Sequence, residues 1–259
     1  LNARFGGGTV IAGEAKIEDR ILQCNPIIEG LGNAKTVRND NSSRFGKYVS
    51  LFIEGKNIIG ASIKSYLLEA IRVTTPNNSE RNYHVFYQML KGCSDEMMND
   101  FRLPRNPTGF KFLSRSNCYE VTTINDMEEY AEMIKSMDTL NVKGPQRYAF
   151  WRVIGAVLHT AGIDYDDSAY DGSSSCQVKT KASFSGLAHT LQVDEDMLFK
   201  ALTTRTSVVV GKEIIMYLDK NGCDNQAEAF AKEIYSKMFD WIIKYLNLAL
   251  LPSSLRGTG

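Results

Sequence analysis

The sequence predicts a mixed fold, in which strands lie in the first ninety residues and helices dominate beyond residue 80. Two runs rich in β-branched and aromatic residues, 48–53 and 57–63, flank Glu54-Gly55-Lys56 and predict a β-hairpin. Farther along, apolar residues recur at intervals of three and four, as they do on the buried face of a helix. With 259 residues, of which 43% are hydrophobic, the chain is long enough to bury a substantial core as one large or two modest domains.

The segments on either side of the hairpin are predicted from their own patterns. Residues 1–17 mix glycine, alanine and isolated polar residues without a sustained period, which predicts a surface-loop leader. The apolar positions within 21–31 allow a short helix, and Pro26 limits its continuity because proline lacks the amide hydrogen that a helix interior needs. After the hairpin, aromatic residues at helical spacing within 81–91 predict an amphipathic helix.

Two helices are predicted in the middle of the chain. The first has Asn125 or Asp126 available as its cap. Its expected core face consists of Met127, Tyr130, Ala131, Ile134 and Met137. The second, over 148–158, is apolar nearly all round and should be buried, with Pro145 in its first turn.

The last predicted helix covers 226–246 and is the longest. Its expected core stripe consists of Phe230, Ile234, Met238, Trp241, Ile242 and Tyr245. Beyond it, Pro252 and the closing glycines predict an irregular tail over 248–259.

Charge and cysteine content exclude several classes of protein. Thirty basic and thirty acidic side chains give a formal net charge of zero, so no global field directs the chain toward nucleic acid or anionic lipid. Five cysteines at irregular spacing, with no Cys-x-x-Cys pair, predict reduced thiols. Neither a membrane-spanning run of about eighteen apolar residues nor the apolar block of a signal peptide is present. These features together predict a cytoplasmic protein without a membrane span.

The polar run from Asn39 to Lys47, Asn-Asp-Asn-Ser-Ser-Arg-Phe-Gly-Lys, stands immediately before the hairpin. Two adjacent hydroxyls can serve a nucleoside triphosphate when a loop closes over its γ-phosphate, because one can bind Mg²⁺ while the other orients the attacking water. An arginine next to them can fasten the closed loop to a carboxylate. Taken alone, the same residues also fit an ordinary Asx or Ser turn.

The flanks of this run resemble switch I of the myosin motors and the segment that leads into it. Further segments resemble other myosin signatures in the correct order, namely Asn25 to Glu29, Tyr66 to Val73, Glu80 to Gln88, Leu202 to Arg205 and Ala231 to Trp241. The resemblance covers residues 18–247. Kinesins also carry Asn-x-x-Ser-Ser-Arg, but theirs continues with Ser-His, whereas Phe-Gly-Lys follows in this chain. We therefore expect a myosin-like motor head, with ATP and Mg²⁺ as its cofactors.

The resemblance implies a role for four residues of the run. Ser43 would bind Mg²⁺ through its hydroxyl, and Ser42 would hold the lytic water near the γ-phosphate. Asn39 would contact the triphosphate, and Arg44 would pair with a glutamate of the second switch. Phosphoryl transfer requires such placement of water and neutralisation of spreading negative charge, without a covalent nucleophile from the protein.

Two nucleotide-site motifs of the family are missing from these 259 residues. Neither the phosphate-cradling Gly-x-x-x-x-Gly-Lys-Ser/Thr nor the second switch, Asp-x-x-Gly-Phe-Glu, occurs. Gly6-Gly7-Gly8 lacks the lysine and hydroxyl that would follow in a phosphate site. The chain is thus expected to be the central part of an α/β motor head of the P-loop NTPase kind, and to hydrolyse no ATP in isolation. The alternative is a non-catalytic fragment that keeps only an actin-interacting lobe.

The resemblance also divides the chain and implies its partners. Residues 18–90 would hold switch I and part of the nucleotide-site sheet, and residues 91–247 a mainly helical upper lobe that faces actin. Two surface loops, 206–217 and 167–185, are the candidate contacts with the actin filament. The remaining partner would be the rest of the myosin heavy chain, in a cytoskeletal complex.

Overall fold

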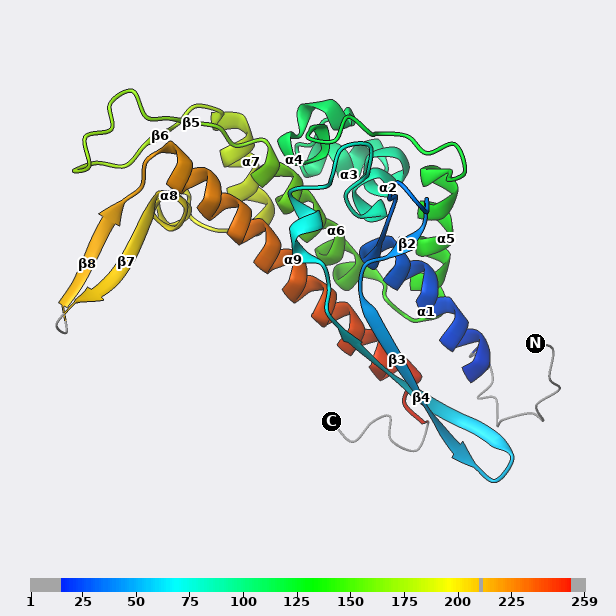
Figure 1. The fold of residues 1–259 in the computed structure, drawn as a ribbon. Coiled ribbons are helices and arrows are strands. Elements are labelled where there is room, and N and C mark those ends of the chain that lie inside the picture. Colours follow the sequence, from blue (N-terminus) through cyan, green and yellow to red (C-terminus); the bar gives the residue numbers. More distant parts are fainter. Residues whose placement is uncertain (1–14, 210–211, 253–259) are drawn as a thin grey trace.

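A computed structural model describes residues 15–209 and 212–252 (Figure 1). Nearly all of the predicted leader and most of the predicted tail lie outside these residues. The longest helix, α9 (Lys220–Leu250), runs diagonally through the molecule (Figure 1). One hairpin extends from near the start of α9 and another lies beside its end, while the other helices pack along it.

The elements follow one another in a mixed order. The α-helices before α9 are α1 (Ile17–Gly32), α2 (His84–Gly92), α3 (Asp95–Asp100), α4 (Lys111–Ser114), α5 (Asp126–Thr139), α6 (Gly144–Ala161), α7 (Lys181–Leu191) and α8 (Glu195–Thr203). Two short 3-10 helices are η1 (Ala70–Val73) and η2 (Pro107–Gly109). The strands form antiparallel pairs, namely β1 (Asn33–Ala34) with β2 (Ser42–Ser43), β3 (Gly46–Glu54) with β4 (Asn57–Tyr66), β5 (Tyr165–Asp166) with β6 (Gln177–Val178), and β7 (Thr204–Val209) with β8 (Lys212–Tyr217).

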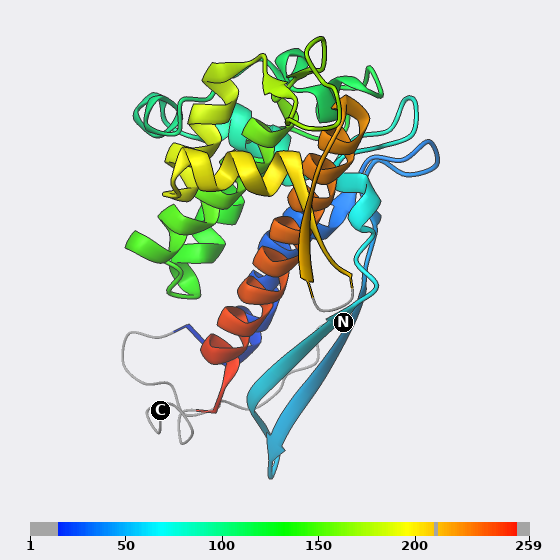
Figure 2. The ribbon, with the colours of Figure 1, turned by 90° about the vertical axis from the view of Figure 1, so that its left-hand side faces the viewer.

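The main hydrophobic core lies among α1, α2, α5, α6 and the C-terminal half of α9. Trp151 of α6 is fully buried in it, and Tyr83 stacks on Tyr235 of α9 with ring centroids 5.2 Å apart. A second buried cluster joins α7, α8 and the first turns of α9. Figure 2 shows these helices grouped at one end, with the β3–β4 hairpin reaching past the helices at the other.

The prediction that Pro26 limits the first helix is wrong, because α1 runs unbroken from Ile17 to Gly32. Ile27, Ile28 and Leu31 are fully buried against neighbouring helices. Removing this apolar surface from water outweighs the loss of one backbone hydrogen bond at proline.

The predicted hairpin is confirmed in type and in position. Glu54 pairs with Asn57, so Gly55 and Lys56 form a two-residue turn. Gly55 has a φ of +62°, a conformation that glycine adopts without a steric penalty. The far end of the hairpin is fixed to α9, since the Asn247 side chain accepts from the amide of Ile63 at 2.7 Å and donates to its carbonyl at 2.8 Å.

Helix α5 begins as predicted and turns part of its expected face to the core. The Asn125 side chain caps it by accepting from the amides of Met127 and Glu128 at 3.1 and 3.4 Å. Of the expected face, Met137 is buried and Tyr130 and Ile134 pack against the core, whereas Met127 is 58% exposed. Met133, which was not expected there, is also buried. Helices α1 and α2 pack against α5, and Asp126 in its first turn is buried and paired with Arg81.

Helix α9 is longer than predicted and is rotated relative to the expected stripe. Its buried side chains are Cys223, Ala227, Ala231, Tyr235, Met238, Phe239, Ile242, Ile243, Leu246 and Leu250. Of the predicted stripe, only Met238 and Ile242 are fully enclosed, while Phe230, Ile234, Trp241 and Tyr245 lie partly buried at the edge. Because α9 continues to Leu250, the first residues of the predicted irregular tail are helical. Among the described helices, none is long and apolar enough to cross a membrane.

Candidate functional site

The polar run forms a turn and a short strand between α1 and β3. Its two serines, Ser42 and Ser43, are the strand β2, which pairs with Ala34 and Asn33 at the end of α1. The chain returns between these strands through a tight turn, in which the Thr36 amide donates to the Asn39 carbonyl at 2.8 Å. The Asn39 side chain accepts from the amide of Asn41 at 2.9 Å, which is an Asx turn. The run therefore contains the Asx turn expected from its residues, and the residues expected of a switch loop lie in and directly after that turn.

Two side chains fasten the middle of this turn to its surroundings. The Asn41 side-chain oxygen accepts from the Asn33 amide group at 2.9 Å and lies 3.2 Å from Nε2 of His84. Asp40 pairs with Lys35 at 2.8 Å, and this hydrogen bond, together with one from Thr123, lowers the pKa of Asp40. The turn is thus held to both α2 and the loop before α5.

The two serine hydroxyls lie on an accessible part of the loop. Ser43 is exposed and donates to the carbonyl of Phe45 at 3.1 Å, and Ser42 is half-buried with its oxygen 3.4 Å from the Arg44 guanidinium. Asn39 is exposed as well. Asn39 and Ser43 are thus accessible in this structure, whereas the Ser42 oxygen lies beside the Arg44 guanidinium.

Phe45 anchors the loop on the side that leads into β3. Its ring meets that of Phe239 on α9 edge to face, with centroids 5.4 Å apart. It also lies against Gly32, where a Cβ atom would come within 2.4 Å of the ring. Glycine at the end of α1 is therefore required for Phe45 to reach the core.

Arg44 forms the strongest contact of the loop. Its guanidinium donates to both carboxylate oxygens of Glu69, at 2.7 and 3.1 Å. We expected its carboxylate to come from a second switch, so the pairing with Glu69 corrects the view that this chain offers Arg44 no partner. Such two-point pairing is the geometry in which arginine and carboxylate bind most specifically. It raises the pKa of Arg44 through the hydrogen bond to Glu69.

Glu69 is the first member of a chain of alternating charges. Arg72, which is 3% exposed, donates to Glu69 at 2.5 Å and to Glu80 at 3.1 Å. Glu80 in turn accepts from the amide of Val37 at 3.3 Å. Burial opposes ionisation of Glu69 and Glu80, but the hydrogen bonds from the arginines outweigh it and lower the pKa of both carboxyl groups. Both ends of the loop, Val37 and Arg44, are thus held by one network.

The sequence contained a signal for this missed partner. In the hairpin, Gly46 pairs with Tyr66. Continuing that register past the last pair places residue 44 beside residues 68 and 69. A hairpin prediction centred on Gly55 therefore brought residue 44 near residues 67–69, and the one-residue register shift at Phe52/Ile53 fixed the final alignment.

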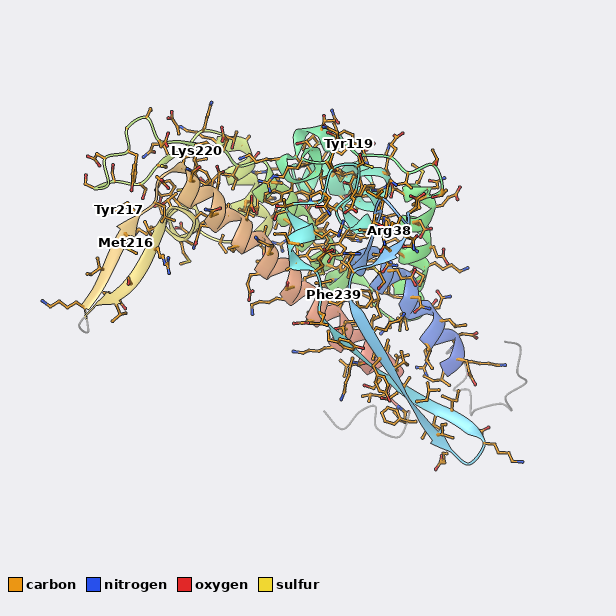
Figure 3. The ribbon with its side chains drawn as sticks, in the orientation of Figure 1. Arg38, Tyr119, Met216, Tyr217, Lys220 and Phe239 are labelled. Carbon is orange, nitrogen blue, oxygen red and sulfur yellow. The ribbon has the colours of Figure 1, made fainter. Side chains whose placement is uncertain are left out.

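The two loops predicted to meet actin lie together at the other end of the molecule. The described residues of 206–217 form most of the β7–β8 hairpin, whose exposed apolar side chains include Val208, Ile214 and Ile215. The Tyr170 hydroxyl, in the 167–185 loop, donates to the Tyr217 carbonyl at 3.1 Å. Figure 3 shows Met216, Tyr217 and Lys220 at this end.

Salt bridges fix this end of the molecule to α9. Lys220 pairs with Asp164 at 2.6 Å and with Asp224 at 3.4 Å. Lys111 of α4 joins Asp224 at 3.2 Å. Within 15–209 and 212–252, no group of histidine, cysteine or acidic residues could hold a metal ion by itself.

Comparison with known proteins yields one consistent relationship. Residues 6–256 match the family described as Myosin head (motor domain). The chain is 36% identical over 249 residues to Myosin IE heavy chain of Dictyostelium discoideum, covering 93% of this chain and 25% of that protein. It is 37% identical to Unconventional myosin-Ic of Mus musculus, in an alignment that covers 90% of this chain and 22% of that protein. It is also 37% identical to Myosin-16 of Arabidopsis thaliana, where the alignment covers 96% of this chain and 20% of that protein. The chain thus spans a quarter or less of the length of these relatives.

Proposed function

The chain belongs to the myosin head family, and from that premise we propose that it supplies the γ-phosphate-sensing loop and an actin-facing lobe of an ATP-driven actin motor. One observation carries the proposal. The loop is anchored through Val37, Asn41 and Arg44, while the Ser43 hydroxyl between them is exposed. A loop anchored on both sides of an exposed hydroxyl can present that hydroxyl to a ligand and can respond when the ligand leaves.

In this proposal each of the four loop residues has one task. Ser43 binds the Mg²⁺ that accompanies ATP, and Ser42 orients the lytic water. Asn39 contacts the triphosphate, and Arg44 holds the loop in place through a carboxylate. When ATP and Mg²⁺ are bound, the metal neutralises charge that develops on the γ-phosphate.

The chain by itself is proposed to be inactive as an ATPase. It lacks the glycine-rich cradle and its lysine within the 259 residues. Each hydrogen bond from such a cradle to a phosphate contributes about 1.5–3 kcal/mol, so several missing bonds remove micromolar affinity. Titration of the purified chain with a fluorescent ATP analogue and Mg²⁺ tests this point. Saturable binding together with Ser43-dependent hydrolysis would overturn it.

The phosphate-sensing role is tested in a chimera. Residues 18–247 replace the matching segment in the head of Myosin IE heavy chain, which supplies the remaining parts of the nucleotide site. We expect actin-activated ATPase activity from the chimera and a loss of about 100-fold or more when Ser43 is changed to alanine. Ser50→Ala in β3 is the matched control and should keep the activity. An active Ser43→Ala chimera would refute the proposed role of this hydroxyl.

Contact with actin is the second part of the proposal. The β7–β8 hairpin presents apolar side chains, with Ile215 59% and Val208 67% exposed, next to the 167–185 loop. A co-sedimentation assay with actin filaments tests it, comparing the chain with an Ile214→Ser, Ile215→Ser variant. Equal sedimentation of both would refute the contact through this hairpin. Binding without any ATPase in the chimera would favour the alternative of a non-catalytic actin-interacting lobe.

The remaining partner in the proposal is the rest of a myosin heavy chain. Along β3 and β4, Tyr48, Ile53 and Tyr66 are 61%, 64% and 52% exposed. Among the described residues, the hairpin is a two-stranded sheet with open edges. Open edges and exposed apolar side chains fit pairing with further strands of a motor head. The complete protein is proposed to act in the cytoplasm on the actin cytoskeleton.

A further inference from the structure

A polar cavity of about 310 Å³ lies between α1, α2, α5 and the turn that precedes Ser42. Glu29 and Gly30 of α1, His84 and Gln88 of α2, and Glu129 of α5 line it together with residues 39–41 of the turn. The cavity therefore adjoins the loop described above and shares Asn39 with it, while its helical lining residues take no part in the proposed phosphate contacts.

Two buried side chains on the cavity wall have acceptor atoms without a partner in the described structure. Gln88 is 3% exposed, and its Oε1 accepts no hydrogen bond. A Cβ on Gly30 would lie 2.1 Å from Met133 Cε and 2.8 Å from this oxygen, so glycine at this position lets both side chains pack against α1. His84 is 4% exposed, and its Nδ1 is also unpartnered.

The hydrogen bonding around His84 defines which kind of group is missing. The Asn41 oxygen that faces Nε2 of His84 already accepts from Asn33, so it acts as an acceptor and Nε2 carries the proton. Burial, with a smaller effect of the Arg81 charge, lowers the pKa of His84 to about 3, so the ring is neutral at pH 7. Its Nδ1 is then a second unsatisfied acceptor. Both buried atoms thus require a donor.

The charges at the cavity are predominantly negative, which also favours a ligand that donates hydrogen bonds. Asp40 has Lys35 as its counter-ion, and Asp126, the first residue of α5, has Arg81 at 2.7 Å. Within the described parts of the chain, Glu29 and Glu129 have no counter-ion. Burial, and then the charges of Glu132 and Glu29, raise the pKa of Glu129, as expected for carboxylates crowded without a cation.

We propose that this cavity binds a guanidinium or alkylammonium group between Glu29 and Glu129, with Gln88 and His84 as further acceptors. Every polar group named here accepts hydrogen bonds, and a guanidinium offers five donors and a positive charge. The carboxylates of Glu29 and Glu129 repel a triphosphate and attract a cation, although Asn39 of the phosphate-sensing loop also lines the cavity. The cation can come from a free amine or from an arginine side chain of a polypeptide.

Nuclear magnetic resonance of the purified chain tests the proposal at the site itself. The chain has three histidines, so the His84 ring signals can be assigned with one substituted variant. Titration with n-butylguanidinium should shift these signals saturably, with a dissociation constant on the order of 1 mM. The neutral isostere n-butylurea should not shift them. A capped Gly-Arg-Gly peptide gives the second arm, and tighter binding of the peptide than of butylguanidinium assigns the cation to a polypeptide.

Charge-neutralising variants show whether the carboxylates are responsible. Glu29→Gln and Glu129→Gln should each weaken binding by about threefold, and both together by about tenfold. Glu128→Gln, on the same helix but outside the cavity lining, is the matched control and should leave the affinity unchanged. Circular dichroism verifies that each variant folds. If the double variant does not fold, the affinities of the two single variants test the proposal. Binding of butylurea as tight as that of butylguanidinium, absence of saturation, or indifference to both substitutions would overturn the proposal.

Discussion

Removing the charge of Glu69 is the most informative perturbation of the loop. The carboxylate accepts two hydrogen bonds from Arg44 and one from Arg72, and its side chain is 30% exposed. In Glu69→Gln, a neutral amide replaces it and Arg44 loses its counter-ion, while Arg72 keeps Glu80. Hydrogen bonds to charged groups contribute about 1.5–3 kcal/mol, and partial exposure reduces this, so we expect a loss of about 2–3 kcal/mol of unfolding free energy.

Thermal unfolding of the purified chain measures this loss. For a protein of this size, each kcal/mol corresponds to about 2–4 °C, so Tm should fall by about 4–12 °C. Glu54→Gln, at the exposed turn of the same hairpin, is the matched control and should leave Tm within about 1 °C. A double-mutant cycle with Arg44→Gln isolates the pairing energy. A fall in Tm of less than about 2 °C for Glu69→Gln, or additive effects in the cycle, would refute the reasoning.

The pH dependence of the same variant provides a further check. The folded-state pKa of Glu69 lies below its ordinary value of 4.5, because the arginine hydrogen bonds outweigh burial. The stabilisation is therefore present above pH 4.5 and is lost as the pH falls through the lower folded-state pKa. The difference in unfolding free energy between the wild-type chain and Glu69→Gln should thus shrink below pH 4.5. A constant difference down to pH 3 would contradict it.

Three further predictions concern the support of the loop and of its neighbouring helices. The pKa of His84 is about 3 in the folded chain, whereas its ordinary value is 6.5. Between these pH values the unfolded chain binds more protons than the folded chain does. The free energy of unfolding should therefore fall by about 1.4 kcal/mol per pH unit below pH 6.5. Urea unfolding at pH 7 and 5.5 measures this, and His84→Gln should flatten the dependence. Gly32→Ala places a methyl group within 2.4 Å of the Phe45 ring and should cost about 1–3 kcal/mol, whereas Gly109→Ala, with nothing nearby, should not. Asn125→Ala removes the cap of α5 and should cost about 1 kcal/mol in the same assay, with Asn99→Ala as the exposed control.

Local sequence signals predicted the parts of the fold that depend on neighbouring residues. Gly55 fixes a two-residue turn because it adopts a positive φ without strain, and the turn sets the register of the first pairs, up to the shift at Phe52/Ile53. Asn125 and Pro145 mark helix starts for equally local reasons. The order of the Ser-Ser-Arg run and its flanking signatures also predicted the family.

Long-range packing decided what these local signals left open. Pro26 remains inside α1 because the buried side chains around it stabilise the helix more than one lost hydrogen bond weakens it. The buried face of α9 is displaced from the expected stripe, since Tyr235 and Phe239 pack on Tyr83 and Phe45, which are more than a hundred residues away. Periodicity predicts that a helix has an apolar face, but it does not say which of two adjacent apolar rows meets the rest of the core.

The Ser-Ser-Arg run illustrates both contributions in a single site. The sequence by itself determined the residue types, two hydroxyls and one guanidinium, and therefore the chemistry that this loop can offer. Only the tertiary structure assigned Glu69 to Arg44, connected Glu80 to Val37, and placed Gln88 and His84 around an acidic cavity next to the same loop. The physical reason is that ion pairs and cavities depend on the packing of several elements, whereas hydroxyl and guanidinium chemistry belongs to each residue wherever it lies.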